Sequence, residues 1–161
     1  MKQTSKQYFS ILNLLHLAML VGQLVFLTFT VVNIAPNTTS YLSQILVINL
    51  AIAFVVTMGV SLGARAYFNA KINSIKQSPT LVSKLNQYRS ALLIKYAILE
   101  SGTMLTIILY WFNAHVLFLV LTGGLLIIFI LHRTTKAKLI KDLALDFQEQ
   151  SLLDDPEYLI Q

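Results

Sequence analysis

The chain has 161 residues, of which 56% are hydrophobic and only 12% are charged, and its mean hydropathy is +0.68. Soluble domains contain about 25% charged residues, so this composition excludes an ordinary soluble protein and predicts that the chain is embedded in lipid. Cysteine is absent, which excludes disulfides, thiolate catalysis and metal sites built from cysteine.

Four apolar stretches are predicted to span the membrane as helices. A helix needs about 20 apolar residues to cross ~30 Å of hydrocarbon, and backbone groups inside lipid must find hydrogen bonds within the protein. The stretches are residues 9–32, 43–67, 90–112 and 115–131. We therefore expect an all-α integral membrane protein in which residues 1–133 form a bundle of four transmembrane helices. The first stretch is longer than the apolar segment of a signal peptide, so we expect it to be retained.

The positions of the basic residues predict the orientation of the bundle. Basic residues lie before the first stretch, between the second and third, and after the fourth, whereas residues 33–42 and 113–114 carry no charge. Cytoplasmic loops are rich in Lys and Arg, so both termini are expected in the cytoplasm, in a multi-pass protein of the plasma (inner) membrane. Cations that flank apolar spans also favour contact with membrane lipid over contact with nucleic acid.

The connection between the second and third stretches is predicted to be a long cytoplasmic hairpin of two helices. The second helix is expected to continue through Ile72 and Ile75 because these residues keep the apolar spacing of a helix. Ser78 and Pro79 fit a helix cap followed by the first helical residue, so the third helix is expected to begin at Pro79. The tip of the hairpin would then lie near residues 76–79.

The segment after the fourth stretch, residues 134–161, is predicted to form a cytoplasmic amphipathic helix and an acidic tail. The helix is expected over residues 136–150, and it would lie against the membrane or the bundle, or present a docking surface to a partner. Its apolar stripe consists of Leu139, Leu143 and Phe147. Six of the seven acidic residues follow residue 141, and residues 157–161 are expected to be mobile.

Glu100 is the residue most informative about function. It is the only acidic residue before Asp142. At ~1.5 Å per helical residue it lies about 14 Å inside the third predicted span, or ~8 Å if Lys95 marks the boundary of the membrane. An ionised carboxylate at that depth is costly unless it is paired, so Glu100 is expected to be buried and either protonated or hydrogen-bonded. Acids inside membranes commonly carry protons or cations; the alternative role is to hold helices together.

Polar residues on the other spans are the expected partners of this carboxylate. His16 and Thr57 are predicted to lie ~10–12 Å deep, near the same level, and Tyr96 shares the helix face of the carboxylate. Gln23 and Asn49 are predicted to form a second polar level, roughly 20 Å from the inner end of the spans. Hydrogen bonds between helices are the expected role of that second level.

Small residues and histidines complete the candidate features. Gly59, Ser61 and Gly63 alternate along the second stretch, and small residues allow helices to approach closely in lipid. The histidines are predicted to lie too far apart to share a metal ion, and no catalytic motif occurs. We therefore expect no catalytic residues, no metal and no cofactor, and we do not expect an enzyme.

A helix–loop–helix pattern covers residues 57–112. It consists of GVSLG at 59–63, KQSP at 76–79 and ILESG at 98–102. This pattern resembles the hairpin of the proteolipid c subunits of rotary ATPases, in which a glycine-rich helix, a polar loop with an Arg-Gln-Pro signature and a returning helix with one carboxylate follow in that order. The resemblance implies that Glu100 carries protons or sodium ions. The longer loop and the two additional helices depart from the pattern of that family.

Two functions are compatible with these features. The chain is either a proton- or cation-coupling or transport subunit that uses Glu100, or a non-catalytic membrane scaffold or assembly subunit. In the second case its cytoplasmic hairpin and acidic tail would bind a partner. Because four helices enclose little space, we expect a homo- or hetero-oligomer with other membrane subunits.

Overall fold

The computed structural model describes residues 3–36 and 43–160, which form six α-helices and two short strands. The long helices are α1 (Ser5–Asn33), α2 (Gln44–Ile75), α3 (Leu81–Asn113) and α4 (Val116–Leu131). The short elements are α5 (Lys136–Leu143), α6 (Phe147–Asp154), β1 (Gln3–Thr4) and β2 (Leu159–Ile160).

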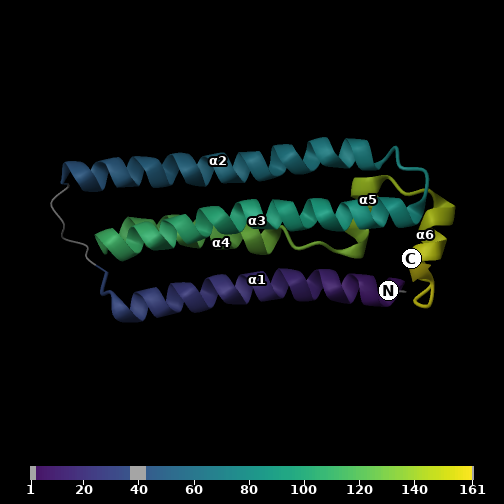
Figure 1. Ribbon diagram of the computed structural model, residues 1–161, viewed down its shortest axis with the longest axis horizontal. Helices are drawn as coiled ribbons and strands as arrows, with labels where there is room; N and C mark the ends of the chain where they lie inside the picture. Colours follow the sequence, from purple (N-terminus) through teal and green to yellow (C-terminus); the bar gives the residue numbers. More distant parts are fainter. Residues whose placement is uncertain (1–2, 37–42, 161) are drawn as a thin grey trace.

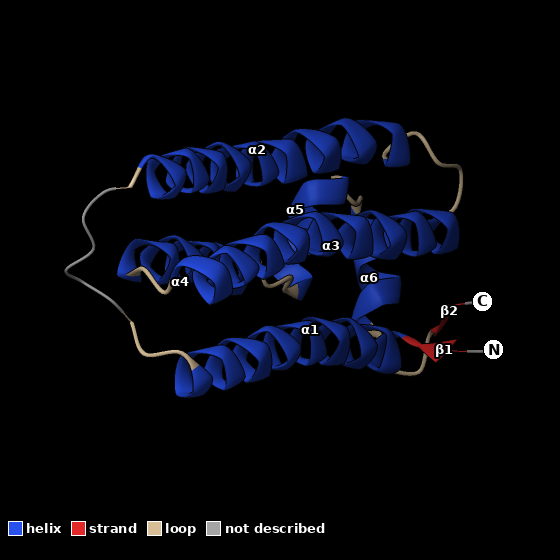
Figure 2. Ribbon diagram, turned by 60° about the vertical axis from the view of Figure 1, so that its left-hand side comes forward, coloured by secondary structure: helices blue, strands red, loops and turns tan. Residues whose placement is uncertain are grey.

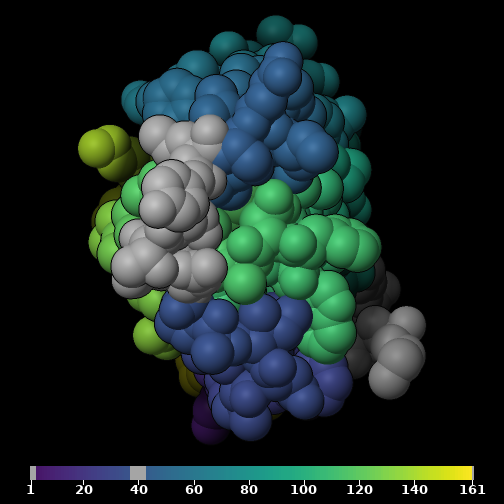
Figure 3. All heavy atoms as spheres, turned by 90° about the vertical axis from the view of Figure 1, so that its left-hand side faces the viewer, coloured from purple at the N-terminus to yellow at the C-terminus, as the bar shows by residue number. Residues whose placement is uncertain are grey.

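The long helices form a bundle in which α3 and α4 lie between α1 and α2. In Figure 1, α1 and α3 run in one direction and α2 and α4 run in the other. The end-on view of Figure 3 shows the green atoms of α3 and α4 between those of α1 and α2. The turn between α2 and α3 lies at the same end of the bundle as α5, α6 and the β1–β2 pair (Figure 2). We call α5, α6, β1 and β2 the end layer.

Three helices, α1, α2 and α3, are long and apolar enough to cross a membrane. The fourth predicted span corresponds to α4, which has 16 residues and is therefore about 24 Å long at ~1.5 Å per residue. A bend of 79° separates α4 from α5. The prediction of an all-α membrane protein is confirmed at this level, with three to four candidate spans.

Within α1, the buried face of the span is polar and the exposed face is apolar. The buried residues of its membrane portion include His16, Gln23 and Thr30, which recur every seven residues and therefore share one face. Val25 and Phe29 are exposed. This distribution is typical of a helix whose outer surface contacts lipid, because the lipid chains are as apolar as a protein core.

The helix caps explain where the hairpin turns. As predicted, α2 continues to Ile75, but the prediction for the start of α3 was two residues too early. Thr80 caps α3 by accepting a hydrogen bond from the Ser83 backbone N–H (3.2 Å), and helix begins at Leu81. Pro79 therefore lies in the turn and not in the first helical turn. From Leu81 the helix runs unbroken to Asn113.

The single helix predicted over residues 136–150 is instead two helices. Ala144 has a positive φ of 50° and ends α5, and Asp146 starts α6 through a capping box with Glu149. Because of this break, the three residues of the predicted apolar stripe do not share one face. Leu139 and Leu143 are buried, whereas Phe147 is 86% exposed.

The end of the tail is also part of the fold. This corrects the prediction of a mobile end for residues 157–160. Residue 161, which the prediction included, lies outside the described residues. Strand β2 pairs with β1 in antiparallel register, Gln3 with Ile160 and Thr4 with Leu159. Next to the strands, the Ser5 hydroxyl donates to the Leu153 carbonyl at 2.8 Å. The acidic tail therefore folds back onto the start of α1.

A large hydrophobic core joins the end layer to the bundle. Its buried members include Tyr8 of α1, Leu85 of α3, Leu143 of α5 and Leu153 of α6. The Tyr8 hydroxyl donates to the Leu85 carbonyl at 2.7 Å. Apolar burial drives packing most strongly where water is the competing solvent, which fits the concentration of tail residues in this core.

Close helix packing depends on a different small residue from those predicted. A Cβ atom at Gly59 or Gly63 would meet no atom within 4 Å, whereas a Cβ at Gly102 would meet Val60 Cγ2 at 2.5 Å. Gly102 therefore allows α3 to approach α2, and the glycines of α2 face open space in the single chain.

Candidate functional site

Glu100 is half-buried on the side of α3 that faces α1. It follows Tyr96 by one helical turn, so the two side chains share a face. The Tyr96 ring packs against His16 of α1 with 5.0 Å between ring centroids. The Glu100 carboxylate has no hydrogen bond or ion pair with any residue that the structure describes.

None of the three expected neighbours forms a direct hydrogen bond with Glu100 among the described residues, and a contact through water stays a prediction. His16 stacks on Phe129 of α4, with ring centroids 4.7 Å apart and planes 6° from parallel. The Tyr96 hydroxyl donates to the His132 carbonyl at 3.2 Å. Thr57 donates to the Ala53 carbonyl of its own helix at 2.8 Å.

The structure brings His16 and Tyr96 together at the joint between α1, α3 and α4. The Tyr96 hydroxyl also lies 3.1 Å from the Thr134 hydroxyl, which follows the end of α4. His16 is 6% exposed, and its Nδ1 atom is buried without a hydrogen-bond partner among the described residues. These two residues therefore connect α1 to the end of α4 and leave the carboxylate one turn away.

The register of α1 against α3 places Gln23 within about one helical turn of the height of Glu100. The Tyr8 hydroxyl bonds to the Leu85 carbonyl, 77 residues later, and the Tyr110 hydroxyl bonds to the Ile34 carbonyl, 76 residues earlier. The His16–Tyr96 ring contact joins residues 80 positions apart, so a residue of α1 lies beside a residue 76 to 80 positions later in α3, which places Glu100 beside residues 20–24.

Gln23 is fully buried, and both its Nε2 and its Oε1 atom lack a hydrogen-bond partner within the described part of the chain. The prediction that Gln23 and Asn49 form one polar level was wrong. Asn49 donates to Asn113 at 3.0 Å, at the opposite end of the bundle from the end layer.

Buried threonines continue this polar region along the bundle, up to ~9 Å beyond Glu100 at ~1.5 Å per helical residue. The hydroxyls of Thr106 in α3 and Thr122 in α4 lie 2.9 Å apart, and Thr103 is fully buried one turn before Thr106. Sequence reasoning did not select Thr106 and Thr122, although the spacing of Thr103, Thr106 and Tyr110 could have indicated a polar face. We call Gln23, Glu100, Thr103, Thr106 and Thr122 the polar layer.

The chemistry open to the polar layer follows from its functional groups. It offers carboxylate, amide and hydroxyl oxygens, which are ligands for hard cations and acceptors for protons. The described residues contain no cluster of three or more His, Asp or Glu side chains that could hold a metal ion. An ion at this level would therefore be coordinated by Glu100 with neutral oxygens, and not by several acids.

Comparisons of the chain with known protein families, with curated proteins and with solved structures find no match.

Proposed function

We propose that the chain is a membrane subunit that carries protons or cations on Glu100. The observation that supports this proposal is the isolation of the carboxylate. Glu100 is the only acidic residue before Asp142, and it has no bonded partner among the described residues. A carboxylate inside a membrane needs a proton, an ion or another group to offset the loss of water.

The alternative role of Glu100, holding helices together, requires a partner within the bundle. The nearest polar group by register is Gln23, whose amide atoms are also unpaired. A residue kept for structure alone would be expected to have its hydrogen bonds satisfied inside the folded chain. An unpaired half-buried carboxylate within about one helical turn of an unpaired buried amide favours a site that exchanges its ligand.

The same proposal includes orientation and assembly. The end layer and the basic hairpin lie at one end of the bundle, and the positive-inside rule assigns that end to the cytoplasm of a plasma (inner) membrane. A homo- or hetero-oligomer with another membrane subunit would cover the half-exposed side of Glu100, as the resemblance of residues 57–112 to c subunits implies.

Labelling with dicyclohexylcarbodiimide tests the proposal on the full chain in lipid vesicles. This apolar reagent modifies protonated carboxyl groups, so mass spectrometry should locate the adduct on Glu100 and not on the acids of the end layer. Labelling should fall as the pH is raised, and for a cation carrier it should also fall when that cation is added. Labelling of Glu100 that responds to neither change would contradict an exchanging site.

Two substitutions separate ion carriage from helix association. Glu100→Gln keeps the shape and the hydrogen-bonding capacity but removes the titratable proton, so a carrier should fold and lose ion flux into vesicles. Glu100→Asp should retain part of the flux with a changed pH dependence. Wild-type flux in folded Glu100→Gln would instead assign Glu100 to helix association.

The scaffold function remains as a second candidate because of one observation. The ring of Phe147 is 86% exposed at the start of α6, and an exposed aromatic residue on a folded surface is suited to a protein partner. Deleting the tail would not test this function cleanly, since Leu143 and Leu153 belong to the core. Phe147→Ser should release a partner without unfolding the bundle, and unchanged partner recovery would reject this surface.

A further inference from the structure

A second polar site, separate from the polar layer, lies at the junction of α2, α3, α4 and α5. It is a cavity of about 380 Å³ whose apolar side is formed in part by Leu62 and Ile128. The charged and titratable side chains that line it are Arg65, Lys95, His132, Lys138 and Asp142. They come from four helical segments, so the fold collects cations that are distant in the sequence.

The charges around this cavity are not balanced. Three cations face one carboxylate, and none of them forms an ion pair with it within the described part of the chain. Asp142 instead accepts a hydrogen bond from the Tyr88 hydroxyl at 2.9 Å. Like charges in a confined site repel one another unless an anion lies between them.

Lys95 contributes most to this imbalance because it is only 4% exposed. Its Nζ atom lies 4.3 Å from the centroid of the Phe68 ring, a contact that partly compensates an ammonium group. Burying a charge without an opposite charge is costly. The side chain lines the cavity, so an anion placed there would supply the missing partner.

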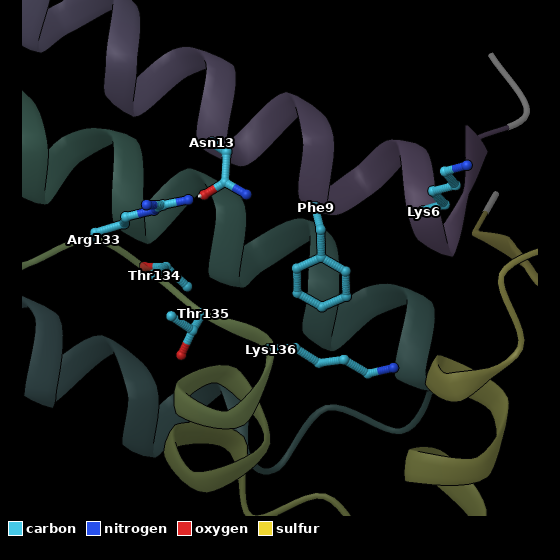
Figure 4. Close-up of a pocket in the computed structure, with 7 residues that line it drawn as sticks. All are labelled: Lys6, Phe9, Asn13, Arg133, Thr134, Thr135 and Lys136. Carbon is cyan, nitrogen blue, oxygen red and sulfur yellow. Dashed lines mark hydrogen bonds between the residues drawn. The ribbon is translucent and has the colours of Figure 1, made fainter.

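Another basic cavity at this end of the bundle differs in this respect (Figure 4). It has a volume of about 410 Å³ and is lined by Lys6, Arg133 and Lys136 among others. Lys136 forms an ion pair with Asp154 at 2.5 Å, and Arg133 is directed toward Asn13, with Nε 3.4 Å from Oδ1. Arg133 and Lys136 already have polar partners, in contrast to Lys95.

We propose that the cavity at the α2–α5 junction binds a phosphate group, with Arg65, Lys95 and Lys138 as its cationic ligands. Arginine offers a planar pair of donors that matches two phosphate oxygens, and lysines add compact positive charge. Asp142 accepts a hydrogen bond from Tyr88. Its negative charge repels a phosphate, so the phosphate is expected beside the three cations.

The position of the cavity admits two sources of phosphate. Arg65 lies near the end of the apolar stretch of α2, where phospholipid headgroups meet water, and basic pockets between membrane helices commonly hold anionic lipids. A soluble phosphate compound would enter from the hairpin side. Both present the same oxygens to the three cations.

Thermal unfolding of the full chain in dodecyl maltoside distinguishes these sources. The probes are dioctanoyl phosphatidylglycerol, dioctanoyl phosphatidylcholine and inorganic phosphate, all at equal ionic strength. A rise in the unfolding midpoint with phosphatidylglycerol alone would assign the site to a lipid headgroup. A rise with inorganic phosphate that phosphatidylglycerol does not exceed would assign it to a soluble compound. If none of the three probes raises the midpoint above that of the chain without a probe, the proposal is overturned.

Matched variants locate the effect. Lys138→Gln and Lys95→Met should each weaken binding of the active probe about tenfold or more, because each removes a contact with a charged group. Lys141→Gln is the control for Lys138, since Lys141 is exposed on the same helix and does not line the cavity. If Lys138→Gln binds as tightly as Lys141→Gln, the phosphate lies elsewhere. Lys138 is on a short surface helix, so its variant tests the site even if Lys95→Met fails to fold.

Discussion

Hydrogen bonds join the bundle to the end layer: Ser5 of α1 donates to the Leu153 carbonyl, and Tyr88 of α3 donates to Asp142. In the polar layer, Gln23 and Glu100 have no such partners among the described residues. Groups next to water can hydrate when they are unpaired, so their pairing inside the end layer reflects specific packing. Groups in lipid have no water to replace a missing partner. The end layer therefore has most of its polar groups paired within a single chain, with Gln3 Nε2 as an exception, whereas the polar layer has an unpaired amide and an unpaired carboxylate.

The largest expected effect tests whether the end layer is a cooperative part of the fold. Leu143 is 1% exposed, and truncation of a buried leucine costs ~2–5 kcal/mol, so Leu143→Ala should sharply lower the stability against SDS in mixed micelles. Leu152→Ala is the control because Leu152 is 42% exposed. Equal stability of both variants would show that the tail is not part of the core.

A smaller loss is expected from the polar contacts of the same layer. Tyr88→Phe removes the hydroxyl that bonds to Asp142, and a hydrogen bond to a charged group contributes ~1.5–3 kcal/mol. The loss should appear in the same SDS titration. A Tyr88→Phe, Asp142→Asn double variant should be less destabilised than the two single losses combined, and full additivity would argue against a direct bond.

The contact between α2 and α3 within the bundle should be sensitive at one glycine. Gly102→Ala places a methyl group against Val60, and overpacking costs ~1–3 kcal/mol. Gly59→Ala meets only open space and should be neutral or slightly stabilising. If the two variants have equal stability in mixed micelles, the approach of α3 to α2 is looser than this packing requires.

The smallest expected effect is a gain in stability, and it most directly tests the difference between the polar layer and the end layer. Gln23→Leu removes two buried atoms without partners, and relief of an unsatisfied group is worth about 1 kcal/mol or more, so a single chain should become more stable. Gln87→Leu is the contrast, because Gln87 donates to Ser78 and Ser83 and should lose stability. A destabilised Gln23→Leu would mean that Gln23 is satisfied in the membrane.

The helices could be predicted from local composition, but the polar layer could not. Apolar length indicates α1, α2 and α3, and the periodicity through Ile72 and Ile75 indicates that α2 extends beyond its apolar stretch. The height of Gln23 relative to Glu100 depends on distant contacts, namely Tyr8 with Leu85 and Tyr110 with Ile34. No pattern within one helix encodes such a register.

The tail shows a second reason why sequence reasoning was incomplete. A helix through residues 136–150 satisfies the periodicity of Leu139 and Leu143, yet Ala144 adopts a left-handed backbone conformation that a helical pattern does not reveal. The break allows Leu145 and Leu153 to enter the core, so tertiary burial outweighs local helix propensity there.

The pairing of β1 with β2 also imposes an order of events during synthesis. Gln3 and Ile160 pair with each other. Gln3 is synthesised first, so it has no strand partner until the four long helices and the tail have been made. A protease site engineered beside Gln3 would thus be cleavable early and protected later. The moment at which that cleavage stops would show when the end layer closes in a living cell.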